Sequence, residues 1–444
     1  MEKSLTLIND LIKSAKKAGA DAVDVLFYES TSLSASRRMG QPEGLERAEN
    51  KGIGLRVFVG KRAAIVSSSD TGSEALRGLV ERSVAMAKLS PEDEYLSLAP
   101  GELLAKEIIN LDLYDKHEPT PEWLQEQCKI AEDSALAVKS VTNSEGASAD
   151  YGSVTFALAA SNGFSGAYKA SNISVSVSVL AGNEGALERD YDFSSARFVA
   201  DLASADTIGI NAAKRAIARL NPRKIPTSII PVVFDPRVSK GLVRAFSGAI
   251  NGSAIARGTS FLKDSLGKQI FSNAVSIIDD PHRLRGLGSK PFDGEGVKNQ
   301  KISLVENGVL QTWLLDMRSA NRLGLTTTGH ASRGLSSPPS PHGTNVYLAA
   351  GELTPDELIS DIKNGFYVNE VFGMGINLIT GDYSQGASGF FIENGKKSYA
   401  VSEVTIAGKL SHMFRELIPA NDLLFRYPTN APTLRIEGMT VAGM

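Results

Sequence analysis

Five histidines are the side chains of this sequence best suited to bind a metal ion or to move protons. A zinc site on a helix needs two such ligands about one helical turn apart, and no pair of these histidines has that spacing. His117 is followed by Glu118, but Pro119 and Pro121 come directly afterwards and favour a surface loop. The other four are His282, His330, His342 and His412.

A second group of possible metal ligands lies at Asp279–His282, where two aspartates and a histidine surround a proline. The same residues are typical of an ordinary turn, which is the structure we expect there. Serine catalysis is not indicated, because the sequence contains no G-x-S-x-G motif. The single cysteine, Cys128, excludes an internal disulfide and a cysteine-based zinc cage. It falls in a predicted helix, where we expect a buried core residue.

Two segments without regular periodicity are candidates for contact with a ligand. Leu325–Thr344 is a long polar stretch with three prolines, and long loops in compact domains are often functional. Gly373–Gly389 contains five glycines among seventeen residues, a composition that lets the backbone approach a ligand or another chain closely. It lacks the G-K-[ST] ending of a phosphate-binding loop.

Chain length and net charge further restrict the classes of protein to which this sequence can belong. A chain of 444 residues predicts two or three domains with substantial cores. The net charge of −3 argues against binding to nucleic acid by bulk electrostatic attraction, so we expect no direct contact with nucleic acid. The N-terminal residues have no apolar signal core, and no run approaches the ~18 apolar residues of a membrane span. We therefore expect a cytoplasmic protein that does not enter the membrane.

The first half predicts an N-terminal α/β domain over residues 1–222. Apolar residues at three- and four-residue spacing, and then alternating ones, distinguish helices from strands. The predicted helices are 5–15, Ser73–Leu89, Pro121–Val138 and Asp206–Leu220; the predicted strands are Asp21–Tyr28, Ile53–Val59, Ala63–Ser67 and an antiparallel pair within Ser153–Leu180. Two prolines, Pro222 and Pro226, surround a basic pair and mark the domain boundary.

The second half, residues 227–444, predicts a mainly antiparallel β domain. Asn307–Gly308 and Asn394–Gly395 each separate alternating apolar runs and favour type I′ hairpin turns. Thr354–Ile362 predicts a helix with a capping box. Other strands are expected at 229–234, 274–278, 309–315, 344–348 and 434–441. The predicted fold class is thus α+β: an N-terminal α/β domain followed by a mainly antiparallel, barrel- or sandwich-like C-terminal domain. The sequence does not decide whether the C-terminal sheet closes into a barrel.

Five segments, in their order along the chain, resemble the TldD/PmbA family, also called modulators of DNA gyrase. They are ARGTSFL (256–262), SIIDDP (276–281), FDGEGV (292–297), GMGINLITGDYSQGASGFFIENG (373–395) and PTLRIEGMTVAG (432–443). The resemblance implies a cytoplasmic two-subunit protease that acts on unfolded peptides, in maturation of a peptide-antibiotic precursor and in degradation of an antitoxin. It also implies that one subunit carries zinc on an H-E-x-x-x-H helix before the ARGTS-like segment, with a later cysteine ligand.

This chain departs from that zinc pattern. The implied metal-motif positions are Val243, Arg244 and Gly248, and 418–422 (IPAND) holds no cysteine where that ligand would stand. Zinc needs about three protein ligands and an open position for water. The resemblance therefore implies a PmbA/TldE-like subunit that has no metal or other cofactor and is not catalytic alone, with zinc in a TldD-like partner. Whether the chain forms a homodimer when the partner is absent is not decided by the sequence. Arg244 is expected to join its helix to a neighbouring carboxylate.

An unfolded peptide can bind such a complex by adding a strand to an exposed sheet edge. We predict that the glycine-rich segment and the loop Gly329–Thr344 line its passage. The candidate residues are Gly373, Gly375, Asn377, Thr380, Gly381, Asp382, Ser384, His330 and Arg333.

Two alternatives remain at this point. A peptidase active by itself would need ligands from Asp279, Asp280, His282 or the loop histidines, a set that the spacing does not support. A regulatory protein that influences DNA gyrase would act through protein contacts, given the net charge. Metal content and salt-sensitive DNA binding distinguish the two.

Overall fold

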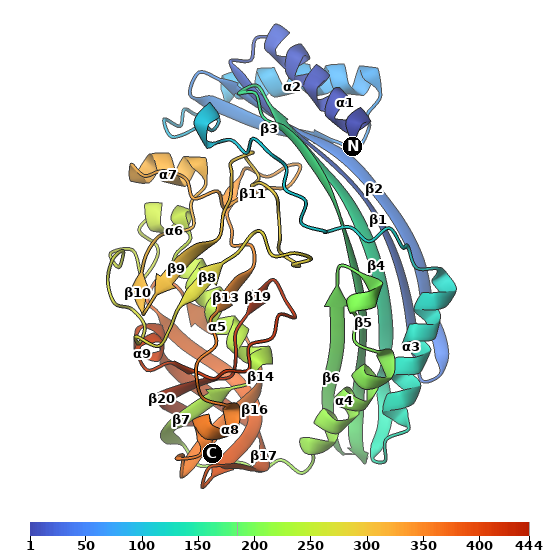
Figure 1. Ribbon diagram of the computed structural model, residues 1–444, viewed down its shortest axis with the longest axis vertical. Coiled ribbons are helices and arrows are strands. Elements are labelled where there is room, and N and C mark those ends of the chain that lie inside the picture. The colour runs from blue at the N-terminus through green and yellow to red at the C-terminus, as the bar shows by residue number, and fades with distance from the viewer. Residues whose placement is uncertain (184, 444) are drawn as a thin grey trace.

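The computed structural model describes residues 1–183 and 185–443, and its two halves lie side by side (Figure 1). The first half is built on one long, curved antiparallel sheet with the strand order β3-β2-β1-β4-β5-β6. Its strands are β1 (Ala22–Arg38), β2 (Gln41–Val59), β3 (Arg62–Ser68), β4 (Val141–Ala160), β5 (Ser165–Asn183) and β6 (Ala186–Ala196).

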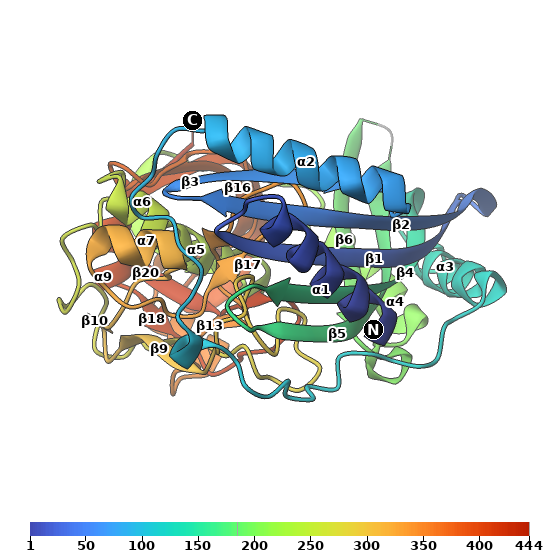
Figure 2. The same cartoon turned by 90° about the horizontal axis from the view of Figure 1, so that it is seen from above.

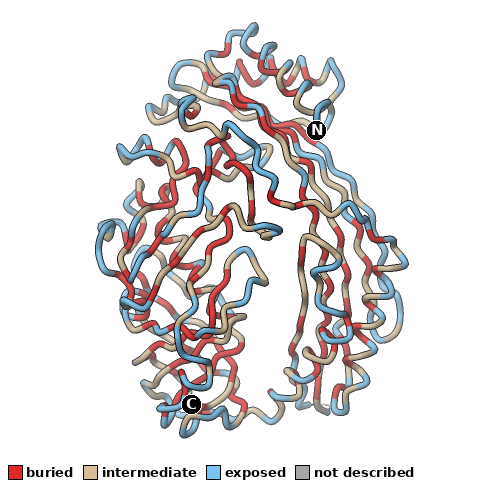
Figure 3. Tube along the Cα trace, in the orientation of Figure 1, coloured by how far each residue is buried: buried red, intermediate tan, exposed pale blue. Residues whose placement is uncertain are grey.

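Two helix pairs cover one face of this sheet. They are α1 (Glu2–Lys17) with α2 (Ser73–Leu89), and α3 (Pro121–Leu136) with α4 (Ala205–Ala218). Val23, Val25 and Phe27 of β1 are buried beneath the first pair, whereas Leu33 and Ala35 are buried beneath the second. These positions are all odd-numbered, so one strand face serves both cores. Figure 2 shows α1 and α2 together above the sheet, and Figure 3 shows the buried residues beneath them.

The opposite face of the sheet turns towards the second half of the chain. Leu26 packs in a small cluster with Phe292, which lies far along the sequence. Asp24 bonds Arg333 of the second half. Further along β1, the same face carries serines at alternate positions up to Ser36.

The second half contains a closed five-stranded barrel in the order β7-β20-β17-β16-β14. Strand β14 pairs with both β16 and β7, which closes the ring, and only the β7–β14 pairing is parallel. The strands are β7 (Ser228–Phe234), β14 (Asn364–Phe372), β16 (Asp382–Glu393), β17 (Lys396–Lys409) and β20 (Leu434–Ala442), with β15 (Ile376–Asn377) and β18 (Ile418–Pro419) at the margin. The predicted β domain is therefore a barrel.

A smaller sheet, in the order β10-β9-β8-β13-β19, stands beside the barrel. Its strands are β8 (Ile277–Asp279), β9 (Ile302–Glu306), β10 (Val309–Leu310), β13 (Val346–Leu348) and β19 (Thr429–Asn430). Helix α5 (Pro236–Ala249) contacts both this sheet and the barrel. The remaining elements are α6 (Gly252–Ala256), α7 (Met317–Leu323), α8 (Pro355–Ile359), α9 (Leu410–Arg415), the strand pair β11 (Ala331–Ser332) with β12 (Ser340–Pro341), and two 3-10 turns at Gly101–Leu103 and Val199–Asp201.

Most predicted elements are confirmed. Asn307–Gly308 and Asn394–Gly395 have the positive φ angles of type I′ turns, and Thr354 forms the predicted capping box with Glu357. The expected strand after Gly308 is wrong beyond Leu310, because the chain leaves the sheet to reach α7. The glycine-rich segment is also more regular than expected, since β16 begins at Asp382. Within the described residues, no helix is long and apolar enough to cross a membrane.

Closure of the barrel depends on Gly389, where β16 passes β14 at a bulge. A Cβ atom at this position would lie 1.9 Å from the carbonyl oxygen of Tyr367. We predict that Gly389→Ala lowers the free energy of unfolding by more than about 2 kcal/mol, because backbone must move to admit the methyl group. The midpoint of urea unfolding measures this loss.

The matched control is Gly78→Ala on α2, where a Cβ atom would meet no atom of the described residues within 4 Å beyond its own turn of helix. This substitution should stabilise the protein by about 0.5–1 kcal/mol, since alanine favours a helix over glycine. Equal effects of the two substitutions would contradict the predicted role of Gly389.

Candidate functional site

Helix α5 carries the positions implied for the metal motif, and local signals explain where it begins. Asp235 caps the helix by accepting a hydrogen bond from the Arg237 N–H (2.9 Å), and Pro236 occupies the first turn. One face of the helix packs into the core of the second half through Val238, Leu242, Val243, Ala245, Phe246 and Ala249. The other face is consequently left for contact with a ligand.

That other face is basic and opens onto two cavities. One has a volume of about 250 Å³ and is lined on the helix by Arg237, Lys240, Gly241 and Arg244. The other has a volume of about 670 Å³ and is lined by Arg244, Ser247 and Gly248. Because Arg244 borders both, the cavities meet at this residue. Spacings of three and four residues place these side chains on one helix face.

The residues at the implied metal positions do not fit zinc. Val243 is buried in the core with 1% of its surface exposed, Arg244 is exposed, and Gly248 has no side chain. None of the three offers a ligand atom, and the guanidinium group of Arg244 repels a cation. Across residues 1–183 and 185–443, no group of three or more His, Cys, Asp or Glu side chains is arranged to hold a metal ion.

Most charges around the smaller cavity are paired. Arg237 binds Asp190 of β6 at 2.7 Å, and Arg219 binds both Glu370, at 2.5 Å, and Asp190, at 3.6 Å. Among the described residues, neither Lys240 nor Arg244 has an ion-pair partner within 4.0 Å. The expectation that Arg244 joins its helix to a carboxylate is therefore wrong, because nearby acids are already bound by other arginines.

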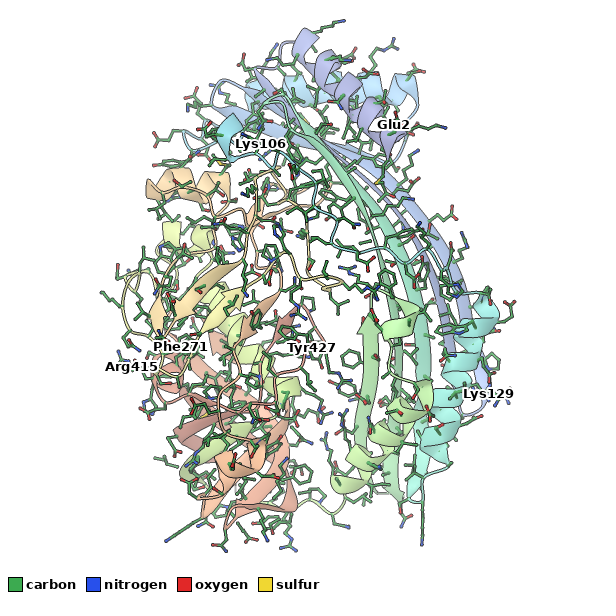
Figure 4. The ribbon with its side chains drawn as sticks, viewed as in Figure 1. Glu2, Lys106, Lys129, Phe271, Arg415 and Tyr427 are labelled. Atoms are coloured by element: carbon green, nitrogen blue, oxygen red, sulfur yellow. The ribbon has the colours of Figure 1, made fainter. Side chains whose placement is uncertain are left out.

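Lys240 is held in an unusual electrostatic environment. Its Nζ lies 3.0 Å from the centroid of the Tyr427 ring, and Tyr427 is on the side of the second half that faces β6 (Figure 4). Burial, together with the positive charges of Arg244, Arg426 and Arg237, lowers the pKa of Lys240 to about 7, and Asp235 opposes this only in part. A lysine that titrates near neutrality can change its charge when a ligand binds.

The larger cavity is also basic. Lys290 lines it, and burial lowers the pKa of its ammonium group. His342 lines the same cavity, where burial and the charge of Lys290 lower the pKa of the imidazole. Both cavities thus favour a ligand that brings negative charge or hydrogen-bond acceptors.

The glycine-rich segment forms a hairpin held by its own hydrogen bonds. Asn377 Oδ1 accepts from the N–H groups of Ile379 and Thr380, and Thr380 Oγ1 bonds Asp382 at 2.5 Å. Ser384 N–H donates to the Gly375 carbonyl, with a separation of 2.6 Å. The hairpin contains the positive-φ residues Gly373 and Gly381.

Apolar side chains are exposed along this hairpin and at the end of β14, which leads into it. Phe372, Met374 and Ile379 are all exposed, and Met374 is fully so. The neighbouring Leu378 reaches back to α5, because a Cβ atom on Gly248 would lie 2.8 Å from its Cδ1 atom. The segment predicted from its composition therefore adjoins the last of the implied metal positions.

The second predicted segment, Gly329–Thr344, is tightly anchored. Asp279 of the SIIDDP segment binds His330 Nε2 at 2.8 Å and accepts hydrogen bonds from the N–H and hydroxyl of Thr344. These bonds hold the pKa of Asp279 below its usual value despite burial. His282 instead contacts Asn299, at 2.8 Å. The structure thus places Asp279 and His330 together as a structural pair and His282 elsewhere.

Arg333 joins the two halves of the molecule. Its guanidinium binds Asp24, which also accepts a 2.7 Å hydrogen bond from Arg56 Nε. Burial opposes ionisation of Asp24, but the two arginines keep its pKa below the usual value. Glu295 of the FDGEGV segment completes the cluster, 3.5 Å from Arg56. His330 and Arg333 are buried, so neither side chain is exposed to a passage in this structure.

Lys240, Lys290 and Asn369 line the cavities but are not among the site residues predicted from the sequence. The spacing of Arg237, Lys240 and Arg244 after an Asp-Pro helix start is a signal that could have found the basic face. Lys290 and Asn369 come from other elements, and their position follows only from the tertiary fold.

We predict that Arg333→Met destabilises the protein by about 3–5 kcal/mol, because it leaves a buried charge on Asp24 with one partner fewer. Arg318→Met is the matched control. Arg318 also joins the halves, through Asp93, but it is exposed, so its loss should change stability by less than about 1 kcal/mol. Thermal unfolding of both variants tests this. Similar melting temperatures for the two would show that the buried cluster does not stabilise the junction.

We further predict that Lys240 reacts with an amine-selective acylating reagent at pH 8 faster than exposed Lys214. With a pKa of about 7, about 0.9 of the Lys240 amines are neutral at pH 8, against roughly 0.004 for an ordinary lysine. Arg244→Gln should slow the reaction, because it removes a positive charge that lowers this pKa. Mass spectrometry of the labelled peptides, at limiting reagent, measures the acylation rates of both lysines. If Lys240 is labelled no faster than Lys214, the lowered pKa of Lys240 is contradicted.

Comparison with family models accounts for most of the chain. The PmbA/TldA metallopeptidase domain 1 matches residues 23–87, the central domain 114–220 and the C-terminal domain 227–443. The first two share the curved sheet, and the third covers the barrel and the site on α5.

Relatives that match over the whole chain belong to the same family as these models. The metalloprotease PmbA homologue of Haemophilus influenzae is 36% identical over 97% of this chain and 94% of its own length, and metalloprotease PmbA of Escherichia coli O157:H7 is 36% identical over 96% and 93%. A crystal structure of a candidate modulator of DNA gyrase from Bacteroides thetaiotaomicron superposes with a TM-score of 0.92 at 27% identity and full coverage of both chains. TldE from Thermococcus kodakarensis has the same fold, with a TM-score of 0.87 at 22% identity, over 98% of this chain and 100% of its own. This chain therefore belongs to the PmbA/TldD family of metallopeptidases.

Proposed function

We propose that this chain is the metal-free, PmbA/TldE-like subunit of a two-subunit peptidase, and that a TldD-like partner supplies the zinc and the catalytic site. The observation that supports this most directly is the composition of α5. At the positions where the family resemblance implies ligands, the helix presents Val243, Arg244 and Gly248. A zinc-bound water cannot be generated without ligands to hold the metal.

The substrate that we propose is an unfolded peptide. The smaller cavity beside Arg244 lies between the two halves of the chain, and the larger one lies within the second half; both are lined by polar and basic groups. By family resemblance, the physiological substrates would be peptide-antibiotic precursors and antitoxins in the cytoplasm. In this proposal the chain binds part of the peptide while the partner cleaves it.

The partner surface that we propose is the glycine-rich hairpin together with the end of β14 that leads into it. Phe372, Met374 and Ile379 are exposed there, and a group of exposed apolar side chains favours contact with another protein. The same surface could join two copies of this chain when the partner is absent. The stand-alone peptidase is less well supported, because Asp279 and His330 are bonded to each other and His282 contacts Asn299.

Mixing experiments test the proposal. The chain purified alone should contain no stoichiometric zinc and should not cleave an unstructured peptide, whereas a mixture with the TldD-like protein encoded in the same genome should do so. Met374→Asp should weaken complex formation at least tenfold, because the charge must lose its water at an apolar interface. Metal analysis measures the zinc content, a peptide-cleavage assay measures the activity, and size-exclusion chromatography measures complex formation.

Glu43→Asp is the control for the hairpin variant, since Glu43 is exposed on the extended end of β2 and lies outside the hairpin segment. Stoichiometric zinc with chelator-sensitive cleavage by the chain alone would refute the metal-free assignment. Normal assembly of Met374→Asp would refute only the proposed surface.

A further inference from the structure

The smaller cavity beside α5 has an excess of positive charge. Its charged lining consists of two acids, Asp190 and Glu370, and four bases, Arg219, Arg237, Lys240 and Arg244. Arg219 and Arg237 bind the two acids, which leaves the other two bases without a counter-charge among the described residues. Two unpaired cations that share a cavity repel each other, so an anion bound between them is stabilised.

Asn369 provides a second, independent sign of a ligand. Asn369 is 7% exposed and lines the same cavity, and its Oδ1 atom has no hydrogen-bond partner among the described residues. A buried hydrogen-bond acceptor without a partner lowers the stability of the folded protein by about 1–3 kcal/mol. The residue stands at the bulge of β14 between Val368 and Glu370, and bulges redirect side chains next to binding sites.

These two features require different groups from one ligand. Lys240 and Arg244 favour a negatively charged oxygen, whereas the Asn369 carbonyl needs an N–H donor. An inorganic anion without N–H groups cannot satisfy both. The C-terminal end of a peptide can, because the Cα atom of its last residue carries both a carboxylate and an amide N–H.

The larger cavity shows where the rest of such a peptide would lie. It begins on the other side of Arg244 and has a volume of about 670 Å³. A peptide whose end is bound beside Lys240 therefore has room for its preceding residues along Ser247 and Gly248 of the same helix. The chain places a guanidinium group at the junction, where it can bind a carboxylate through two parallel hydrogen bonds.

We propose that Lys240 and Arg244 bind the C-terminal carboxylate of a peptide, with Asn369 accepting a hydrogen bond from its last amide N–H. This inference rests on the proposed function insofar as the ligand is a peptide. It adds the part of the peptide that this subunit recognises and assigns a carboxylate-binding role to the helix that carries no metal ligands.

The test uses the full chain without its partner. The probe is an unstructured alanine-glycine pentapeptide with a neutral N-terminal fluorophore, prepared as the free acid, as the C-terminal amide, and as an amide with one internal aspartate. Fluorescence anisotropy should show the free acid binding about 10- to 100-fold more tightly than the amide, the usual difference made by a charged hydrogen-bond partner. Tight binding of the aspartate amide would assign the site to acidic side chains instead and overturn the proposal.

Two variants locate the site. Arg244→Gln should remove most of the preference for the free acid, and Asn369→Leu should weaken both the acid and the amide, because it removes the acceptor of the amide N–H. Arg257→Gln is the matched control, since Arg257 is an exposed arginine beyond the cavities. Circular dichroism verifies folding. An unchanged preference in a folded Arg244→Gln variant would overturn the proposal.

The outcomes also separate this inference from the proposed function. Equal affinities for acid and amide, together with cleavage by the mixed subunits, would refute the carboxylate site and leave the subunit role intact. A clear preference for the acid in a chain that also binds zinc and cleaves peptides alone would support the site and refute the subunit role.

Discussion

The buried carboxylate of Asp24 is the interaction on which the arrangement of the two halves depends. It accepts hydrogen bonds from Arg56 on its own sheet and from Arg333 on the opposite half. For a single buried ion pair, the Coulombic attraction is about as large as the free energy lost on desolvation. Here one buried carboxylate is attracted by two arginines, so the attraction at Asp24 is larger. Leu335, two residues after Arg333, adds a steric contact, because a Cβ atom on Gly54 would lie 2.2 Å from its carbonyl oxygen.

A second set of ion pairs fixes the other end of the junction. Asp190 and Asp192 on β6 bind Arg237 and Arg426, which belong to the second half. With both ends fixed, the basic face of α5 lies opposite the edge of the curved sheet, and the smaller cavity remains between them. An arginine at an implied metal position keeps a positive charge there, but it cannot activate water as zinc does. Under the proposed function, this site binds the peptide and the partner subunit hydrolyses it.

The sequence predicted local structure well, since the signals for it are local. Helix periodicity, the capping box at Thr354 and the two Asn-Gly turns all appear in the structure. The extended end of β2 was missed, because residues 41–50 are polar and exposed and show no alternation. Barrel closure could not be predicted either, since it depends on pairings between strands far apart in the chain.

The candidate site was predictable only in part for the same reason. The glycine-rich segment was identified from composition, and it does adjoin α5 through Leu378. His330 and Arg333 are bonded to residues 51 and 309 positions away, and nothing in the local sequence indicates those partners. The unpaired state of Lys240 and Arg244 depends on which arginines bind Asp190 and Glu370, a result of the tertiary fold.

The order of the barrel strands has a consequence for synthesis on the ribosome. Strand β7 is the first barrel strand to emerge, yet one of its two neighbours is β20, which ends at Ala442. About 200 residues separate Phe234 from Leu434, and at about 5–20 residues per second they take roughly 10–40 s to synthesise. The curved sheet can fold in that interval, whereas β7 and the apolar side of α5 wait for the end of the chain. Nascent chains of this protein should therefore need protection from aggregation mainly during translation of their second half.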